Sequence, residues 1–205
     1  MHSAKIKNSK GSILKIDLSK AFDRVSWLYL RLLLTHPGFN YSFIKRIFAC
    51  ITTTSFVVLI NGAASPFFHS KRGLRQGSPL SPLLFLLVAE GLSRAILDAK
   101  RRGFFEGIKI ATNLTITHLL FVDDILIFCN GSIREVEKLS EILHLFCKAT
   151  WMQLNSHKYT ITTFNLEEDI TREFMELFPF QSYTLDEGLK YLGFRLKPNC
   201  YKKED

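Results

Sequence analysis

Three aspartates are the residues of this sequence best suited to chemistry. Asp123 and Asp124 stand side by side in LLFVDDILIF, between two runs of strand-forming apolar residues, and Asp17 lies within SILKIDLSKAF. Burying two carboxylates side by side costs several kcal/mol unless something positive compensates their charge. The pair therefore lies on a solvated turn or holds a cation.

The residues around these acids predict strands. Alternation before Asp17 puts Leu14, Ile16 and Leu18 on one face of a half-buried strand, and Lys15 and Asp17 on its polar face. The runs on either side of the acid pair predict a β-hairpin with the pair at or beside its turn. If these strands are neighbours in one sheet, the three carboxylates converge, and a hard divalent cation such as Mg²⁺ relieves their repulsion. The alternative is that the pair is a turn signal and Asp17 a strand-end acid.

The remaining pattern predicts an α+β fold, an antiparallel sheet with helices packed on one face. SFVVLINGAASPFFHS predicts two strands around an Asn61-Gly62 turn, TITTF another strand, 179–188 a loop and LKYLGFRL a final strand. Helices are expected after Ser26, at 41–51, at 79–102, after the Ser132/Glu135 capping box and at 166–178.

Composition narrows the class of protein. The 205 residues are 47% hydrophobic, enough for a globular domain with a core, and the net charge of +8 is compatible with a polyanionic partner or with a merely soluble basic surface. Four scattered cysteines without a CxxC pair indicate reduced thiols of an intracellular protein, in the nucleus or cytoplasm, and no targeting signal is seen. The longest apolar run, 83–89, is too short to cross a bilayer, so we expect no membrane association.

Five motifs occur in an order and at spacings that give the chain a family resemblance. They are IDLSKAFDRVSW, RGLRQGSPLSPLLF, FVDD, LNSHKYTI and YLGF. Together they resemble the palm of a reverse transcriptase, in particular that of plant LINE-type (non-LTR) retrotransposons. The resemblance covers essentially the whole chain and implies a palm domain over 1–205, with a core at 1–165 and a thumb-proximal segment at 166–205. Fingers and thumb are then largely missing.

The resemblance implies RNA-directed DNA polymerase activity by two-metal-ion nucleotidyl transfer onto a primer 3′-hydroxyl. Mg²⁺ would be the cofactor, with Mn²⁺ possible, and the partners would be an RNA template, a DNA primer and deoxynucleoside triphosphates, with no obligate protein partner. Asp17 and Asp123 would hold the metals together with the Leu18 carbonyl, and Asp124 would complete the carboxylate set. Phe22 would lie under the incoming sugar, although a core phenylalanine fits the same pattern.

The resemblance also implies a substrate-binding set and a primer-gripping hairpin. The substrate-binding residues would be Arg75, Gln76 and Gly77, before the central helix, and Lys158, as a proton donor to pyrophosphate. The primer-grip-like residues would be Tyr191, Leu192 and Gly193. The plainer alternatives are an ordinary helix-entry loop, a solvated surface lysine and an edge strand.

A second function remains open on the sequence alone. The chain could be a truncated, non-catalytic remnant that keeps the palm fold and at most binds nucleic acid. Intact Asp17, Asp123 and Asp124 favour the polymerase class.

Overall fold

A computed structural model describes residues 10–155, 158–178, 181–184 and 187–196. The chain forms two compact units. The first combines Met1–Ser19, Leu92–Leu145 and Leu154–Asp205, and the second combines Lys20–Gly91 with Phe146–Gln153. Cys200, one of the four cysteines, lies outside the described residues, as do Lys5 and Lys7, which contribute to the net charge.

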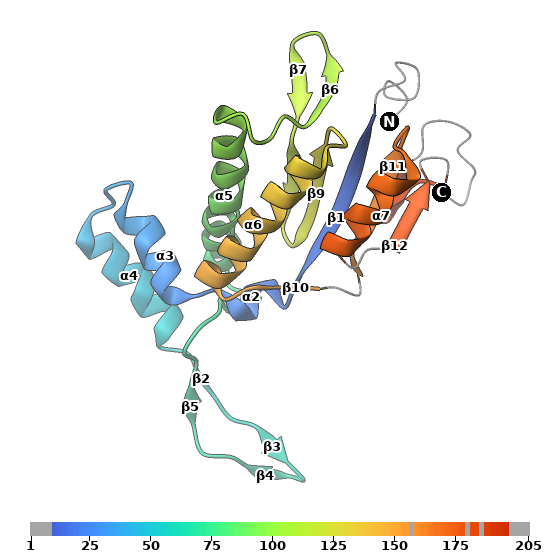
Figure 1. Ribbon diagram of the computed structural model, residues 1–205. Coiled ribbons are helices and arrows are strands. Elements are labelled where there is room, and N and C mark those ends of the chain that lie inside the picture. The colour runs from blue at the N-terminus through green and yellow to red at the C-terminus, as the bar shows by residue number, and fades with distance from the viewer. Residues whose placement is uncertain (1–9, 156–157, 179–180, 185–186, 197–205) are drawn as a thin grey trace. The chain divides into compact units, whose positions relative to one another are not determined.

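The first unit is built on a sheet of strands that come from distant parts of the sequence (Figure 1). Its order is β12-β11-β1-β9-β8, and its pairs are antiparallel except for parallel β11 and β12. The strands are β1 (Gly11–Ser19), β8 (His118–Phe121), β9 (Asp124–Cys129), β11 (Thr160–Phe164) and β12 (Gln181–Thr184). This arrangement makes β1 the central strand and confirms the predicted α+β class.

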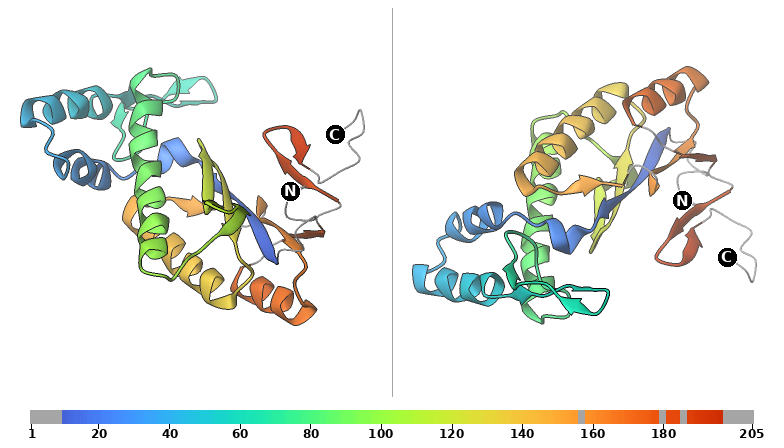
Figure 2. Two further views of the ribbon diagram at one scale, coloured as in Figure 1. Left: turned by 90° about the horizontal axis from the view of Figure 1, so that it is seen from above. Right: turned by 90° about the horizontal axis from the view of Figure 1, so that it is seen from below.

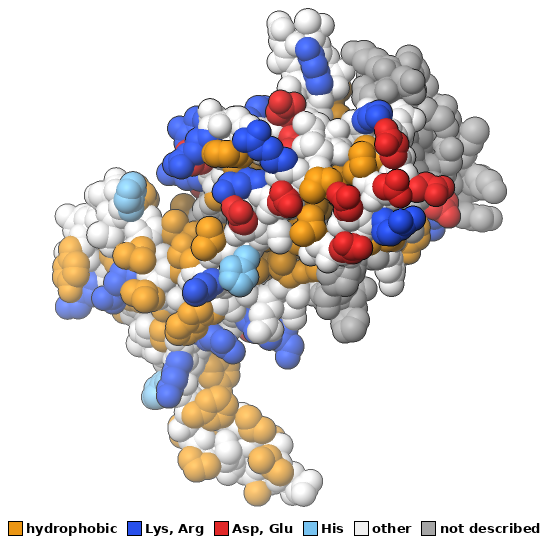
Figure 3. All heavy atoms as spheres, in the orientation of Figure 1, with side chains coloured by type: hydrophobic (Ala, Val, Ile, Leu, Met, Phe, Trp, Pro, Cys, Tyr) orange, Lys and Arg blue, Asp and Glu red, His pale blue; other side chains and the backbone are white. Residues whose placement is uncertain are grey.

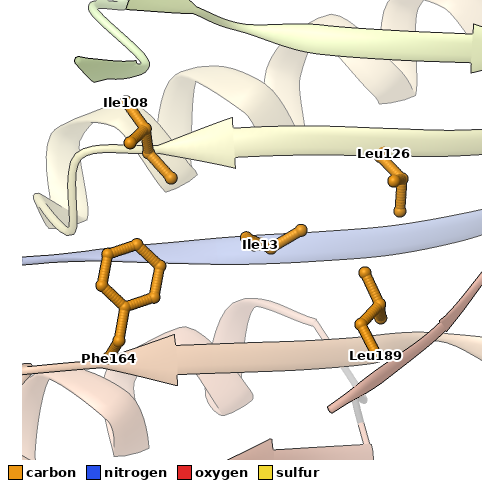
Figure 4. Close-up of a cluster of buried hydrophobic side chains, with 5 residues drawn as sticks. All are labelled: Ile13, Ile108, Leu126, Phe164 and Leu189. Carbon is orange, nitrogen blue, oxygen red and sulfur yellow. The ribbon is translucent and has the colours of Figure 1, made fainter. Parts of the chain in front are cut away.

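Strand β1 is more buried than its alternating sequence indicates. Leu14, Ile16 and Leu18 are buried on one face as expected, but Ile13, on the face of Lys15, is only 5% exposed. Figure 4 shows the cause, a cluster in which Ile13 meets four side chains from other elements, Ile108, Leu126, Phe164 and Leu189. The expected half-buried strand is therefore covered on both faces, because residues far along the chain fold over its second face.

Two predicted helices are confirmed, α7 (Glu168–Leu177) in the first unit and α6 (Ile133–Thr150), which contributes residues to both units. Figure 2 shows α7 and α6 along one face of the sheet. At the start of α6, Ser132 Oγ accepts the Glu135 N–H at 3.3 Å, as a capping box requires. The Glu135 carboxylate, only 3% exposed, accepts backbone N–H groups from Glu106, Gly107 at 3.1 Å and Asn130 at 2.8 Å. It therefore ties the loop before β6 to the end of β9.

Three features of the first unit differ from the sequence-based expectation. A hairpin of β6 (Ile108–Ala111) and β7 (Leu114–Ile116) had no recognised signal, and β12 lies within the expected loop at 179–188. The single final strand that the pattern predicts is a hairpin of β13 (Leu189–Tyr191) and β14 (Phe194–Leu196), as the family resemblance implies. Its turn residues Leu192 and Gly193 have φ of 50° and 85°, the left-handed pair that a tight two-residue hairpin needs.

The second unit contains three helices and a ribbon of short strands. The helices are α2 (Ala21–Arg24), α3 (Trp27–Thr35) and α4 (Tyr41–Thr52), and Ser26 caps α3 by accepting the Tyr29 N–H at 3.3 Å. The ribbon comprises β2 (Ser55–Phe56), β3 (Leu59–Ile60), β4 (Ala63–Ala64) and β5 (Phe68–His69), and the predicted Asn61-Gly62 turn joins β3 to β4. Figure 3 shows apolar side chains along this ribbon. Among its residues, Leu59 and Phe67 are 73% and 78% exposed.

Helix α5 (Leu80–Arg101) contributes residues to both units, and the short β10 (Gln153–Leu154) follows α6. Within the part of the chain that the structure describes, α5 alone is long and apolar enough to cross a bilayer by length and composition, with 33% of its apolar window buried. Its buried side chains, which include Phe85, Val88 and Ile96, recur at helical spacing. The core helix of a globular protein passes the same test, so this finding does not by itself indicate a membrane span.

Candidate active site

The first unit brings the three aspartates to one edge of the sheet. Asp17 near the end of β1 lies directly opposite Asp124, the first residue of β9. Asp123 occupies the two-residue turn between β8 and β9, and its carbonyl accepts the Leu18 N–H at 3.2 Å. The sheet register therefore produces the convergence that the sequence predicts if β1 and β9 are neighbours.

The turn that carries Asp123 holds a strained residue. Val122 has φ of 52°, in the left-handed region that disfavours side chains branched at Cβ. The sequence pattern assigns Val122 to a strand, but it is the first residue of the turn because Phe121 already pairs with Asp124. Backbone strain of this kind costs about 1–3 kcal/mol and persists only where the surrounding structure enforces it.

Asp17 is held by two side chains from the segment after α6. Its carboxylate, in a residue only 7% exposed, lies 3.1 Å from Lys158 Nζ and accepts a hydrogen bond from Asn155 Nδ2 at 3.2 Å. The Asn155 backbone N–H also donates to the Asp17 carbonyl at 2.9 Å. The hydrogen bond and negative charge of Asp17 raise the pKa of Lys158, and the charges of Asp123 and Asp124 raise that pKa further. All three carboxylates therefore act on one ammonium group.

Asp124 has its own cation. Lys15 Nζ lies 3.4 Å from Asp124 Oδ1, and their side chains are 21% and 23% exposed. Lys15 is two residues before Asp17 in β1, so the two side chains share a face of the strand. The acid cluster is thus accompanied by two lysines that come from different segments.

The β13–β14 hairpin lies near the same site. Leu189 of β13 packs in the cluster with Ile13 and Leu126, on the sheet face that carries Lys15 and Asp17, and Tyr191 packs against that cluster. Burial raises the pKa of the Tyr191 hydroxyl, and the negative charge of Asp124 raises it further. The structure therefore places Tyr191 near the carboxylates.

The donor set fits a divalent cation, although the side chains as placed do not form a closed metal site. Among the described residues, no group of three or more histidine, cysteine, aspartate and glutamate side chains is arranged to hold a metal. Instead Lys158 and Lys15 supply the positive charge, so the Lys158 ammonium stands where a cation would compensate Asp17. Carboxylate and carbonyl oxygens are the ligands that Mg²⁺ prefers.

The other expected binding residues belong to the second unit. Phe22 in α2 is half-buried and stacks on Phe85, with 4.8 Å between ring centroids. The segment before α5 is attached to α2 by the Leu74 N–H, which donates to the Phe22 carbonyl at 2.7 Å. Gln76 Nε2 donates to Asp23 Oδ1 at 3.4 Å. The core interpretation of Phe22 and its proposed place under a sugar are compatible, because one ring face can pack while the other is exposed.

Arg75, Gln76 and Gly77 are exposed at the start of α5. A cavity of about 690 Å³ within the second unit includes Arg72, Arg75 and Gln76 in its lining, beside the aromatic rings of Phe56 and Phe68. Gly77 has φ of 83° with no atom within 4 Å of the position a Cβ would take, so its role is conformational. The exposed arginines and the amide can reach an anionic ligand.

Sequence reasoning missed two residues of the site, Lys15 and Asn155. The alternating pattern predicts Lys15 on the polar face of its strand, and its two-residue spacing from Asp17 is the signal that it shares a face with that acid. Asn155 lies in LNSHKYTI, three residues before Lys158, but nothing in that pattern shows that its backbone and side chain both bind Asp17.

The sheet presents three carboxylates at a strand end and an adjacent hairpin turn, with a lysine directed at them, and these are the features that the sequence resemblance implies for a polymerase palm. Comparisons with known proteins identify the family. Residues 1–196 match the family model described as reverse transcriptase (RNA-dependent DNA polymerase), and the chain belongs to that family.

Relatives and a solved structure agree with this assignment. The chain is 26% identical over 160 residues to the retrovirus-related Pol polyprotein from type-1 retrotransposable element R2 of Popillia japonica, covering 77% of the chain and 25% of that protein. It is 48% identical over 67 residues to an uncharacterized mitochondrial protein of Arabidopsis thaliana, covering 32% of the chain and 55% of that protein. Apo telomerase from Candida tropicalis, truncated from its C-terminal domain, shares the fold, with a TM-score of 0.58 and 15% identity over 78% of this chain and 32% of that one.

The family match confirms the resemblance to a reverse transcriptase, and the similarity to a retrotransposable-element Pol polyprotein is consistent with a retrotransposon origin. The chain spans about half of one relative and a quarter of the other.

Proposed function

We propose that this chain is the palm of an RNA-directed DNA polymerase of a non-LTR retroelement, which transfers nucleotides onto a primer 3′-hydroxyl. The observation that carries the proposal is the meeting of Asp17, Asp123 and Asp124 at one sheet edge, with Lys158 3.1 Å from Asp17. A turn signal alone would not require a buried Asp17 directly opposite Asp124. The partners would be an RNA template, a DNA primer and deoxynucleoside triphosphates.

Each residue has a role that its position supports. Asp17, Asp123 and the Leu18 carbonyl would hold two Mg²⁺ ions, or Mn²⁺, with Asp124 completing the carboxylate set. Bound Mg²⁺ would activate the primer hydroxyl and stabilise the leaving pyrophosphate. Asn155 fixes the orientation of Asp17 through two hydrogen bonds. Phe22 would lie under the incoming sugar.

Lys158 is suited to give a proton to the leaving pyrophosphate. Its raised pKa keeps the amine protonated at neutral pH, and its side chain is 62% exposed although it touches the buried Asp17. It can therefore reach a substrate without leaving the site. Arg75, Gln76 and Gly77 would bind the nucleotide or the template, and Tyr191, Leu192 and Gly193 would hold the primer strand.

Primer extension by a hybrid polymerase tests the proposal. This chain replaces the matching region of the R2 Pol polyprotein, and extension on an RNA template is measured with Mg²⁺ for the parent hybrid and for Asp123→Asn. Loss of a metal-holding carboxylate is expected to slow extension by about a thousandfold or more, with little change in duplex binding, because the lost charge repels phosphate. Asp169→Asn is the matched control, since Asp169 is an exposed acid of α7 paired with Arg172 at 3.5 Å.

Two results decide between the candidate functions. An active hybrid whose Asp123→Asn variant keeps the parent rate would show that the carboxylates are turn residues. A hybrid that binds duplex in a salt-dependent way but extends nothing, while unmodified R2 Pol extends in parallel, would favour the non-catalytic remnant.

A further inference from the structure

Lys15 has no role in the family resemblance, yet it makes one of the two ion pairs with the carboxylate cluster. Its ammonium lies 3.4 Å from Asp124 Oδ1 and both side chains are less than a quarter exposed. A pair at this depth is not the solvated surface contact that contributes almost nothing to stability. Removing one partner would leave a half-buried charge without compensation.

The sheet register explains why the pair forms. Lys15 lies opposite Leu126 on β9, two residues beyond Asp124, and Asp124 lies opposite Asp17. Lys15, Asp17, Asp124 and Leu126 therefore share a face, and the lysine meets Asp124 diagonally across the strands. Leu126 belongs to the buried cluster with Ile13 and Leu189, so the stem of Lys15 runs beside apolar side chains. The lysine is thus built into the sheet face.

We propose that Lys15 is a positioning residue that holds Asp124 as its counter-ion and keeps this carboxylate away from the divalent cation. Metal binding is thereby left to Asp17 and Asp123. The inference rests on the proposed function and gives its three acids different roles: Asp17 and Asp123 bind the cation, and Asp124 is the counter-ion of Lys15. Lys158 differs from Lys15 because its exposed side chain is free to follow a substrate, whereas Lys15 stays with Asp124.

The charges of the cluster explain why neutralising Lys15 is expected to raise the affinity for a divalent cation. Three carboxylates and two ammonium groups leave the cluster with one net negative charge, and neutralising Lys15 leaves two and frees Asp124 to approach the metal. Lys15→Met is therefore expected to bind a divalent cation about tenfold more tightly than the parent, since the released Asp124 carboxylate becomes a further oxygen ligand of the cation. Lys15→Arg keeps the ion pair and is expected to bind like the parent.

The experiment is titration of the purified chain with Mn²⁺, followed by the electron paramagnetic resonance of the free ion, with Mg²⁺ as competitor. It is run near 0.2 M salt, where charges further apart than about 7 Å are largely screened. Lys10→Met is the matched control, because it removes the same charge from a lysine paired with Glu167 at 3.3 Å and 59% exposed. It is expected to leave Mn²⁺ affinity unchanged.

A double-mutant cycle shows whether Lys15 acts through Asp124. In the Asp124→Asn background, Lys15→Met is expected to change Mn²⁺ affinity by about twofold or less, because no carboxylate is released. This background also removes the unpaired charge, so the measurement remains valid if Lys15→Met alone folds poorly. An equal tenfold gain in Mn²⁺ affinity in both backgrounds would show that Lys15 acts only through its charge and not through Asp124, and would overturn the proposal.

The remaining outcomes separate this inference from the function on which it rests. If the parent binds Mn²⁺ and loses it in Asp17→Asn, but Lys15→Met binds no more tightly, only the role of Lys15 is wrong. If neither parent nor variants bind Mn²⁺, the metal-dependent function and this inference both fail. In the hybrid polymerase, Lys15→Met is expected to lower the extension rate at saturating Mg²⁺ while Lys15→Arg restores it, a difference that a merely structural lysine would not produce.

Discussion

Val122 offers a test of the backbone strain beside the candidate site. Its φ of 52° is a conformation that costs an L-residue roughly 1–2 kcal/mol relative to ordinary geometry. Asparagine tolerates this region, whereas threonine is branched at Cβ like valine and does not. Val122→Asn and Val122→Thr both replace an apolar side chain that is 40% exposed with a polar one, so their loss of apolar burial is similar. The difference between the free energies of unfolding of these two variants therefore measures the backbone strain at position 122.

We expect Val122→Asn to be more stable than Val122→Thr by about 1 kcal/mol, equivalent to roughly 2–4 °C in Tm for a chain of this size. Thermal and urea unfolding in metal-free buffer measure the difference, and amide exchange of β8 and β9 shows whether it arises in the hairpin. Asn61 gives the reverse experiment, because it has φ of 50° in the Asn-Gly turn of the ribbon. Asn61→Val should lose about as much free energy of unfolding as Val122→Asn gains.

If Val122→Thr is as stable as Val122→Asn, the turn that carries Asp123 is not strained and the argument fails. If the threonine variant is the more stable one, a side-chain contact outweighs the backbone term and the local geometry needs another explanation.

Two further predictions concern the loop before α5 and the buried carboxylate of α6. Gly73→Ala should lower the free energy of unfolding by at least about 2 kcal/mol and Gly77→Ala by about 1 kcal/mol. Both glycines have positive φ, but of the two only Gly73 has an atom close to the position of an added Cβ, Asp23 O at 2.6 Å. Urea midpoints should be lower for Gly73→Ala than for Gly77→Ala, and equal losses would contradict the packing argument. Burial raises the pKa of Glu135 above its usual value of 4.5. The stability that this shift contributes is therefore present below pH 4.5 and is lost as the pH rises through the pKa of the folded state. The urea midpoint of the parent, measured relative to that of Glu135→Gln, should fall from pH 4 to pH 7, and a difference that does not change with pH would refute this prediction.

The sequence predicted the elements that carry the acids because their signals are local. Alternation identified β1, the acid pair marked the hairpin turn, and the capping box located the start of α6. The cover over β1 was not predictable in this way, because Leu189 reaches Ile13 from the far end of the described chain. The β13–β14 hairpin was implied by the family resemblance but not by the local pattern, because Leu192-Gly193 lacks the Asn-Gly signature that revealed Asn61-Gly62.

The ion pairs were missed for a related reason. Whether Lys15 faces Asp124 or solvent depends on the register of β1 against β9, and a shift of one residue would send the lysine to the opposite face. The family resemblance supplied the role of Lys158 but was silent about Lys15 and Asn155. Local patterns thus identified candidate ligands, and only the assembled sheet showed which cations accompany them.

The contact between Leu189 and Ile13 also has a consequence for synthesis of the protein. Strand β1, which carries Asp17, leaves the ribosome about 170 residues before the hairpin that covers it, a delay of roughly 10–35 s at typical elongation rates of ~5–20 residues per second. During that interval Ile13 lacks part of its apolar cover, and pairing of β1 with β9 must also wait for more than a hundred residues. The nascent chain thus exposes an unpaired strand edge, a target for chaperones and a hazard for aggregation. Long-range pairing of this kind also predicts slow refolding in vitro.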